Sequence, residues 1–140
     1  MGLYSAATIP NSIAPGDTVF VWGTPKTASG DPPTVGETPT PGVGGVSASL
    51  QVALANPVSG SNSISFHGQF SGAPGGFEVD CQVSDRDIDA DYQTLSGLNI
   101  TTVDATNQTF HAESVTSARF ARMLMRTRAN SVTIIGSISR

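Results

Sequence analysis

The stretch VSASLQVAL, residues 46–54, alternates apolar with polar or small side chains along its length. One face carries Val46, Ala48, Leu50, Val52 and Leu54, and the other carries Ser47, Ser49 and Gln51. A period of two is typical of a β-strand with one buried face. The stretch therefore predicts a strand that begins a β-rich region.

The same alternation recurs along the rest of the chain, with turn signals such as Asn56-Pro57 and the SGAPGG stretch at 71–76 between the runs. It is clear over residues 63–70, 77–84 and 131–139, and weaker over 98–103 and 110–112. Seven or eight short strands of this kind predict an all-β fold, a single antiparallel β-sandwich of jelly-roll type.

Residues 117–128, SARFARMLMRTR, leave two interpretations open. Phe120, Met123 and Leu124 fit one face of a helix, whereas Ala121, Met123 and Met125 fit one face of a strand. A turn at Ala129-Asn130 and a clear terminal strand follow, so we favour the strand.

Residues 1–45 differ in composition from the predicted β-sandwich domain of residues 46–140. A short apolar patch ends in Val19, Phe20 and Trp22, which predicts either one strand or an anchoring segment for a partner. Residues 23–45 then contain Pro and Gly every few positions, which excludes a helix or a central strand. At about 3.3 Å per residue, an extended arm of this length would span about 75 Å. A long loop is the alternative.

Composition excludes several classes of function. The net charge is −4 with a single lysine, which disfavours a direct nucleic-acid binder. One cysteine cannot form a disulfide within the chain, and 17 Ser and 15 Thr replace much of the usual charge. The first residues lack the pattern of a signal peptide, and no apolar run approaches a membrane span. We expect a protein made in the cytoplasm, without membrane association.

Charge is distributed unevenly along the chain. Residues 71–118 sum to −7 and residues 119–140 to +5, with arginine as the only basic residue of that end. Arginine is favoured for bidentate contacts with carboxylates at interfaces. Two interpretations stay open: a protein interface, or pairing with the acidic segment of the same domain. The residues concerned are Arg119, Arg122, Arg126 and Arg128.

Three groups of residues give only weak evidence for a metal site or a catalytic site. Asp85, Asp87, Asp89 and Asp91 have the spacing of the first part of a calcium loop, but Ala90 stands where that loop needs glycine. A solvated acidic loop is the preferred interpretation. Cys81 lies on the apolar face of its predicted strand, as a buried cysteine would, and the histidines His67 and His111 lie on polar faces. We expect no catalytic residue, metal or cofactor.

The second half of the chain resembles small β-rich virion proteins of tailed bacteriophages. The resemblance covers residues 66–140 and is carried by FSGAPGGFEVDCQVSDRDIDADYQTL, ITTVDATNQTFHAE and ARFARMLMRTRANSVTIIGSISR. When these patterns are combined with the length of 140 residues and the Pro/Gly-rich segment, the chain is most similar to capsid cement, or decoration, proteins. The resemblance implies a structural protein on the outer capsid surface that clamps neighbouring major capsid subunits, and it transfers no catalytic residue.

A dimer or trimer on the capsid lattice is the oligomeric state that symmetry favours. A tail-fibre or glycan-binding jelly roll is one alternative function, and a neck or tail subunit is another. A glycan-binding module would need a concave face with aromatic side chains beside Asp or Asn.

Overall fold

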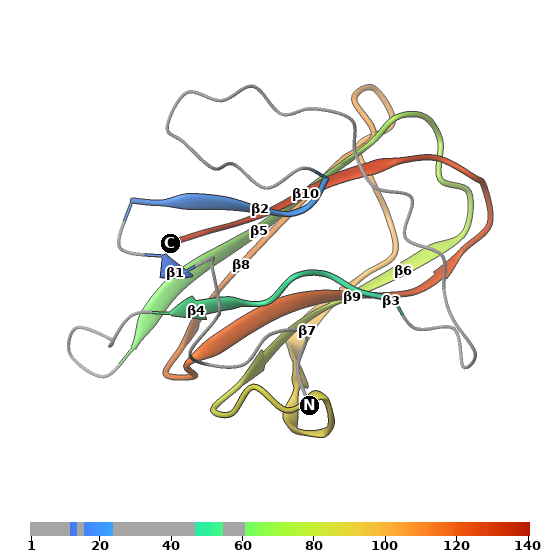
Figure 1. Cartoon of the computed structure of the whole chain (residues 1–140). Coiled ribbons are helices and arrows are strands. Elements are labelled where there is room, and N and C mark those ends of the chain that lie inside the picture. The colour runs from blue at the N-terminus through green and yellow to red at the C-terminus, as the bar shows by residue number, and fades with distance from the viewer. Residues whose placement is uncertain (1–11, 14–15, 24–46, 55–60) are drawn as a thin grey trace.

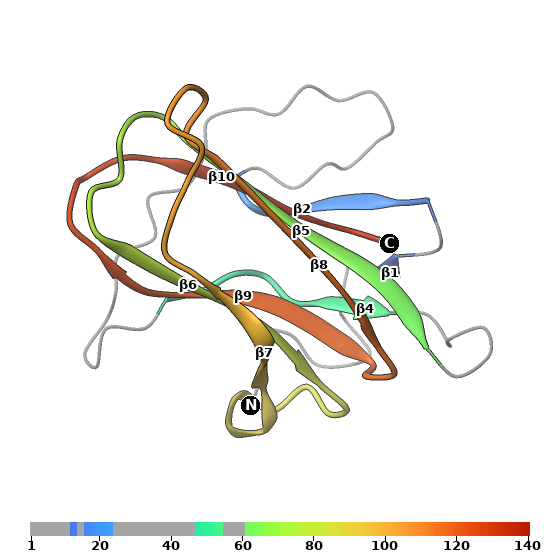
Figure 2. The same ribbon diagram turned by 180° about the vertical axis from the view of Figure 1, so that it is seen from behind.

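Two β-sheets face each other and enclose one apolar core (Figures 1 and 2). The computed structural model describes residues 12–13, 16–23, 47–54 and 61–140. Their elements are β1 (Ser12–Ile13), β2 (Thr18–Trp22), β3 (Ser47–Ala48), β4 (Val52–Leu54), β5 (Asn62–Phe70), β6 (Phe77–Ser84), the 3-10 turn η2 (Asp89–Asp91), β7 (Gln93–Ile100), β8 (Thr109–Thr116), β9 (Phe120–Arg128) and β10 (Ile134–Ser139).

The strand order is that of a jelly roll. One sheet runs β2-β10-β5-β8, and the other runs β1-β4-β9-β6-β7, with β3 also paired to β9. When β3 and β4 are taken as one interrupted strand and the short β1 is set aside, the eight strands follow the orders 1-8-3-6 and 2-7-4-5. Every pairing is antiparallel except the short β1–β4 pair. The predicted fold class is confirmed.

Alternation along the strands places the core between the sheets. In β5 the odd and even positions separate cleanly, with Ile64, Phe66 and Phe70 buried and Ser63 and Gln69 exposed. The opposite sheet contributes an inner face of buried residues from β6 and β9, namely Phe77, Val79, Cys81, Ala121, Met123 and Met125. Burial of this apolar surface is the main stabilising contribution to the fold.

One row across the inner face of the four-stranded sheet combines two large and two small residues. Trp22 of β2 pairs with Gly136 of β10, Gly136 pairs with Gly68 of β5, and Gly68 pairs with Phe110 of β8. A Cβ atom at Gly68 would lie 2.2 Å from Phe110 Cε1, and one at Gly136 would lie 2.8 Å from Trp22 Cε3. The Phe110 ring therefore covers Gly68 and the Trp22 ring covers Gly136, so neither glycine position has space for a larger residue.

The stretch at 46–54 differs from the single regular strand that its alternation predicts. Pairing with β9 is interrupted between β3 and β4, and both Ser49 and Gln51 are buried. Ser49 continues the ladder across the interruption, because its N–H donates to the carbonyl oxygen of Met123 and its Oγ accepts the Met123 N–H, both at 2.8 Å. Leu50 N–H donates to the Val21 carbonyl of β2 at 3.1 Å, which ties the two sheets together.

Strands β9 and β2 are formed by two segments for which the sequence left more than one interpretation open. Residues 120–128 form strand β9, as the preferred interpretation predicted, with Ala121, Met123 and Met125 in the core. The apolar patch before residue 23 forms strand β2, whose Trp22 is buried between the sheets. The sandwich therefore includes a strand that the sequence analysis grouped with the N-terminal segment. Residues 24–46, nearly all of the Pro/Gly-rich segment, lie outside the described residues.

Candidate functional site

The acidic run lies in the loop between β6 and β7, and most of its carboxylates contact protein donors. Asp87 accepts hydrogen bonds from Gln51 Nε2 at 3.0 Å and from Tyr92 Oη at 3.1 Å. Asp91 Oδ2 forms an ion pair with Arg86 Nε at 2.6 Å. Within the part of the chain that the structure describes, no three His, Cys, Asp or Glu side chains come together in a way that could hold a metal ion.

Arg122 of β9 is the centre of this loop's attachment to the sheet. Its Nη1 donates to Asp89 Oδ1 at 2.9 Å, and its Nε donates to Gln82 Oε1 at 3.1 Å. The guanidinium carbon lies 3.9 Å from the centroid of the Tyr92 ring, a cation–π arrangement. Burial raises the pKa of the Tyr92 hydroxyl, and its hydrogen bond and the charge of Asp87 raise it further, so it remains a donor. Arg122 is only 6% exposed.

Arg126 makes a second pair on the same outer face of the six-stranded sheet. Its Nε bonds the buried carboxylate of Asp80, which also accepts from the side-chain amide of Asn99 on β7. The hydrogen bond to Asp80 raises the pKa of the Arg126 guanidinium. Pairing of the arginine strip with the acidic segment, one of the two interpretations of the sequence, is thus observed for Arg122 and Arg126.

The other predicted interface residues lie in several different places. Arg119 is exposed in the turn before β9, and Arg128 Nη1 donates to the carbonyl oxygen of Val132 at 2.9 Å. Val19 and Phe20 are half-buried on β2, and Trp22 is in the core. Of the predicted set, Arg119 is therefore the residue with an exposed side chain and no ion pair among the described residues.

Cys81 and the two histidines are separated by the fold. Cys81 is fully buried between the sheets, and burial raises the pKa of its thiol to about 12, so the nucleophilic thiolate is absent near neutral pH. His67 and His111 lie on the outer face of the opposite sheet, away from the core that holds Cys81. This arrangement separates a thiol from the imidazoles that could activate it.

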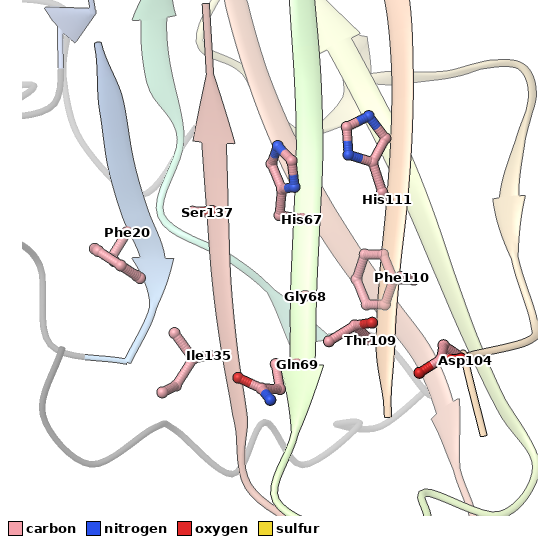
Figure 3. A pocket seen from close by; sticks show the side chains of 10 residues that line it. All are labelled: Phe20, His67, Gly68, Gln69, Asp104, Thr109, Phe110, His111, Ile135 and Ser137. Atoms are coloured by element: carbon pink, nitrogen blue, oxygen red, sulfur yellow. The ribbon is translucent and has the colours of Figure 1, made fainter. Parts of the chain in front are cut away.

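The two histidines mark a shallow groove on the outer face of the four-stranded sheet (Figure 3). They are directly opposite each other on β5 and β8, with ring centroids 4.4 Å apart and the rings perpendicular. The groove has a volume of about 490 Å³ and adjoins a second hollow of about 390 Å³, which shares Gln69 and Ile135 with it. Strand alternation predicted that both histidines lie on polar strand faces, but it did not predict that they lie side by side in a groove.

Comparison of the chain with models of protein families, with curated proteins and with solved structures finds no match. The described ranges also contain no helix with the length and hydropathy that a bilayer crossing requires.

Proposed function

We propose that this protein is a structural virion protein that binds the outer surface of a phage capsid and clamps neighbouring major capsid subunits. The sequence patterns of residues 66–140, which resemble those of small phage virion proteins, support this role. A jelly roll is compatible with it, because capsid and lectin domains use this architecture, although fold analogy alone does not assign a function. In this proposal the protein is not an enzyme and uses no cofactor.

The observation that carries the proposal is that the polar side chains of the β6–β7 loop and of β9 bond to one another and stabilise the fold. The groups that could have supplied chemistry, Asp87, Asp89 and Arg122, fix the β6–β7 loop to the sheet. Cys81 is sealed in the core. A protein that reinforces a shell must keep its shape under load, and many weak contacts on a symmetric lattice then add through effective concentration.

Arg119 is our candidate for contact with an acidic capsid surface, because its side chain is exposed and has no ion pair among the described residues. Arg126 is a second candidate, since 42% of its side chain is exposed beside Asp80. Arg122 is unsuited to direct contact because it is buried. The partner in this proposal is the major capsid protein, and a dimer or trimer would match a capsid symmetry axis.

Density-gradient separation of a lysate of the producing cells, with peptide mass spectrometry of the fractions, tests the proposal. We expect the chain in the fractions of full virus heads, at a copy number close to that of the major capsid protein. A few copies per particle would instead indicate a fibre, neck or tail subunit. A chain found only in the free soluble fraction would refute the virion assignment.

A pair of variants with the same change in net charge tests the contact surface. Arg119→Gln removes one positive charge from the proposed contact, and Ser63→Glu adds one negative charge on the exposed face of the opposite sheet. We expect reduced binding to purified heads for the first variant only, with the thermal unfolding midpoints of both close to that of the unmodified protein. Equal binding by both variants would remove Arg119 from the interface.

A further inference from the structure

The outer groove of the four-stranded sheet is lined by two adjacent rows of side chains that run across the strands. Register places Phe20 of β2, Ser137 of β10, His67 of β5 and His111 of β8 in one row. The adjacent row contains Ile135, Gln69 and Thr109, one from each of β10, β5 and β8. Four strands at roughly 4.8 Å spacing make the row about 14 Å long.

The lining is almost free of net charge. Among the described residues that line the main hollow, the one acidic residue is Asp104, and its Oδ2 accepts the N–H of Asn107 at 2.7 Å, which holds the 104–108 turn at one end of the groove. Burial and the neighbouring imidazole lower the pKa of His67, and the charge of Glu113, whose Oε2 lies 3.9 Å from His111 Nε2, opposes this only in part, so the His67 ring is neutral at neutral pH. The groups that remain are amides, hydroxyls and imidazoles.

Apolar surface lies beside these polar groups. In Figure 3 the side chains of Phe20 and Ile135 lie on one side of Gln69, and Thr109 and Asp104 lie on the other. Flat apolar groups can contact the C–H faces of a sugar ring, while amide, hydroxyl and imidazole groups bond its hydroxyls. An anionic ligand such as a nucleotide would need a fixed positive charge, and no Lys or Arg among the described residues lines the groove. A cationic peptide would meet the carboxylate of Asp104, whose Oδ2 already accepts the Asn107 N–H.

We infer that this groove binds a neutral oligosaccharide, with Gln69, His67 and His111 as the polar contacts and Phe20 with Ile135 as the apolar platform. The length of the row fits a short oligosaccharide better than a single sugar. The site lies on the opposite sheet from Arg122 and Arg126. A protein that binds a capsid through the sheet that carries Arg122 and Arg126 would thus expose the groove to the solvent.

The purified full-length chain can be tested without any virus. The first probe is an array of neutral tri- to hexasaccharides built from glucose, galactose, mannose or N-acetylglucosamine, and the best binder is then titrated by calorimetry at up to millimolar concentration. We expect Gln69→Ala and His111→Ala each to weaken binding at least tenfold. Val115→Ala is the matched control, because Val115 lies on the same face of β8 as His111, is 64% exposed and does not line the groove. We expect its affinity to stay within twofold.

Three results would overturn the inference. The first is that no array member binds at millimolar concentration. The second is binding that Gln69→Ala and His111→Ala leave unchanged, since the sugar would then occupy another surface. The third is a stable dimer, measured by light scattering, that Gln69→Arg converts to a monomer, because the groove would then be an interface between copies of this chain. None of these results depends on whether the protein binds a capsid, so the two proposals fail separately.

Discussion

Replacing Gly68 by alanine tests the tight row inside the four-stranded sheet. The new Cβ atom would lie 2.2 Å from Cε1 and 2.3 Å from Cζ of Phe110, so the ring must move. Phe110 is only 7% exposed and lies 6.3 Å from the ring of Phe70 and 6.5 Å from that of Phe77, so little free volume receives it. Overpacking of a core costs about 1–3 kcal/mol. Alanine recovers about 0.5–1 kcal/mol relative to glycine through the unfolded chain. A 2.2 Å approach is far inside contact distance, so the upper part of the overpacking range applies, about 2–3 kcal/mol, and we expect a net loss of about 1–2.5 kcal/mol.

Urea unfolding followed by tryptophan fluorescence measures this loss, and Gly76→Ala is the matched control. No atom lies within 4 Å of a Cβ at Gly76, and its φ is not positive, so the same substitution there should raise the unfolding free energy by about 0.4–1 kcal/mol through the unfolded chain alone. In a Phe110→Leu background the penalty at Gly68 should shrink, because the clashing atoms are changed. Equal unfolding free energies for Gly68→Ala and Gly76→Ala would refute the close approach of Gly68 and Phe110.

Four further predictions concern other parts of the domain. Arg122→Met should lower the unfolding free energy in urea by about 1–3 kcal/mol, because a buried hydrogen bond and an ion pair are lost; no change would contradict the network. Trp22→Ala should lower the unfolding free energy by about 3–5 kcal/mol, measured in urea by far-ultraviolet circular dichroism, because Trp22 is buried and is the only tryptophan of the chain. Stability should fall as the pH drops below about 6.5, because the lowered pKa of His67 lets the unfolded chain bind a proton first; a His67→Gln variant should show a flatter profile of urea midpoint against pH. Burial raises the pKa of Cys81 to about 12, so its thiol should be inert to Ellman's reagent in the native protein and react fully in urea.

Alternation was sufficient to predict the fold where each strand has one buried and one open face. Strand β5 is the clearest case, since its serines, His67 and Gln69 face outward as their polarity indicates. The same rule misplaced Ser49 and Gln51, because it assumes an unbroken strand, whereas pairing with β9 is interrupted at this point. Strand β7 begins earlier than the weak pattern at 98–103 suggested. It is an edge strand with no fully buried residue, so hydrophobicity does not mark its start.

The candidate sites were harder to predict because they are made by strand register. The partners of Arg122 come from β6 and from the loop that follows it, and spacing along the chain does not identify which carboxylate is within reach. The groove combines Phe20, His67 and His111 from three strands, and their alignment depends on pairings between residues far apart in the sequence. Composition indicated a polar strand face, but it could not indicate that two imidazoles lie directly opposite each other.

The position of β10 also has a consequence for how the protein is made. This last strand in chain order lies between β2 and β5, and Ser139 bonds Thr18 across 121 residues of sequence. During synthesis, β5 can pair with β8 once Thr116 has been made, but β2 cannot join this sheet until translation has passed Ser139. The apolar side chains of β2 have no strand partner until then, and such long-range pairing is slow. We therefore expect translation rate and chaperone supply to control the yield of folded protein more strongly than its final stability does.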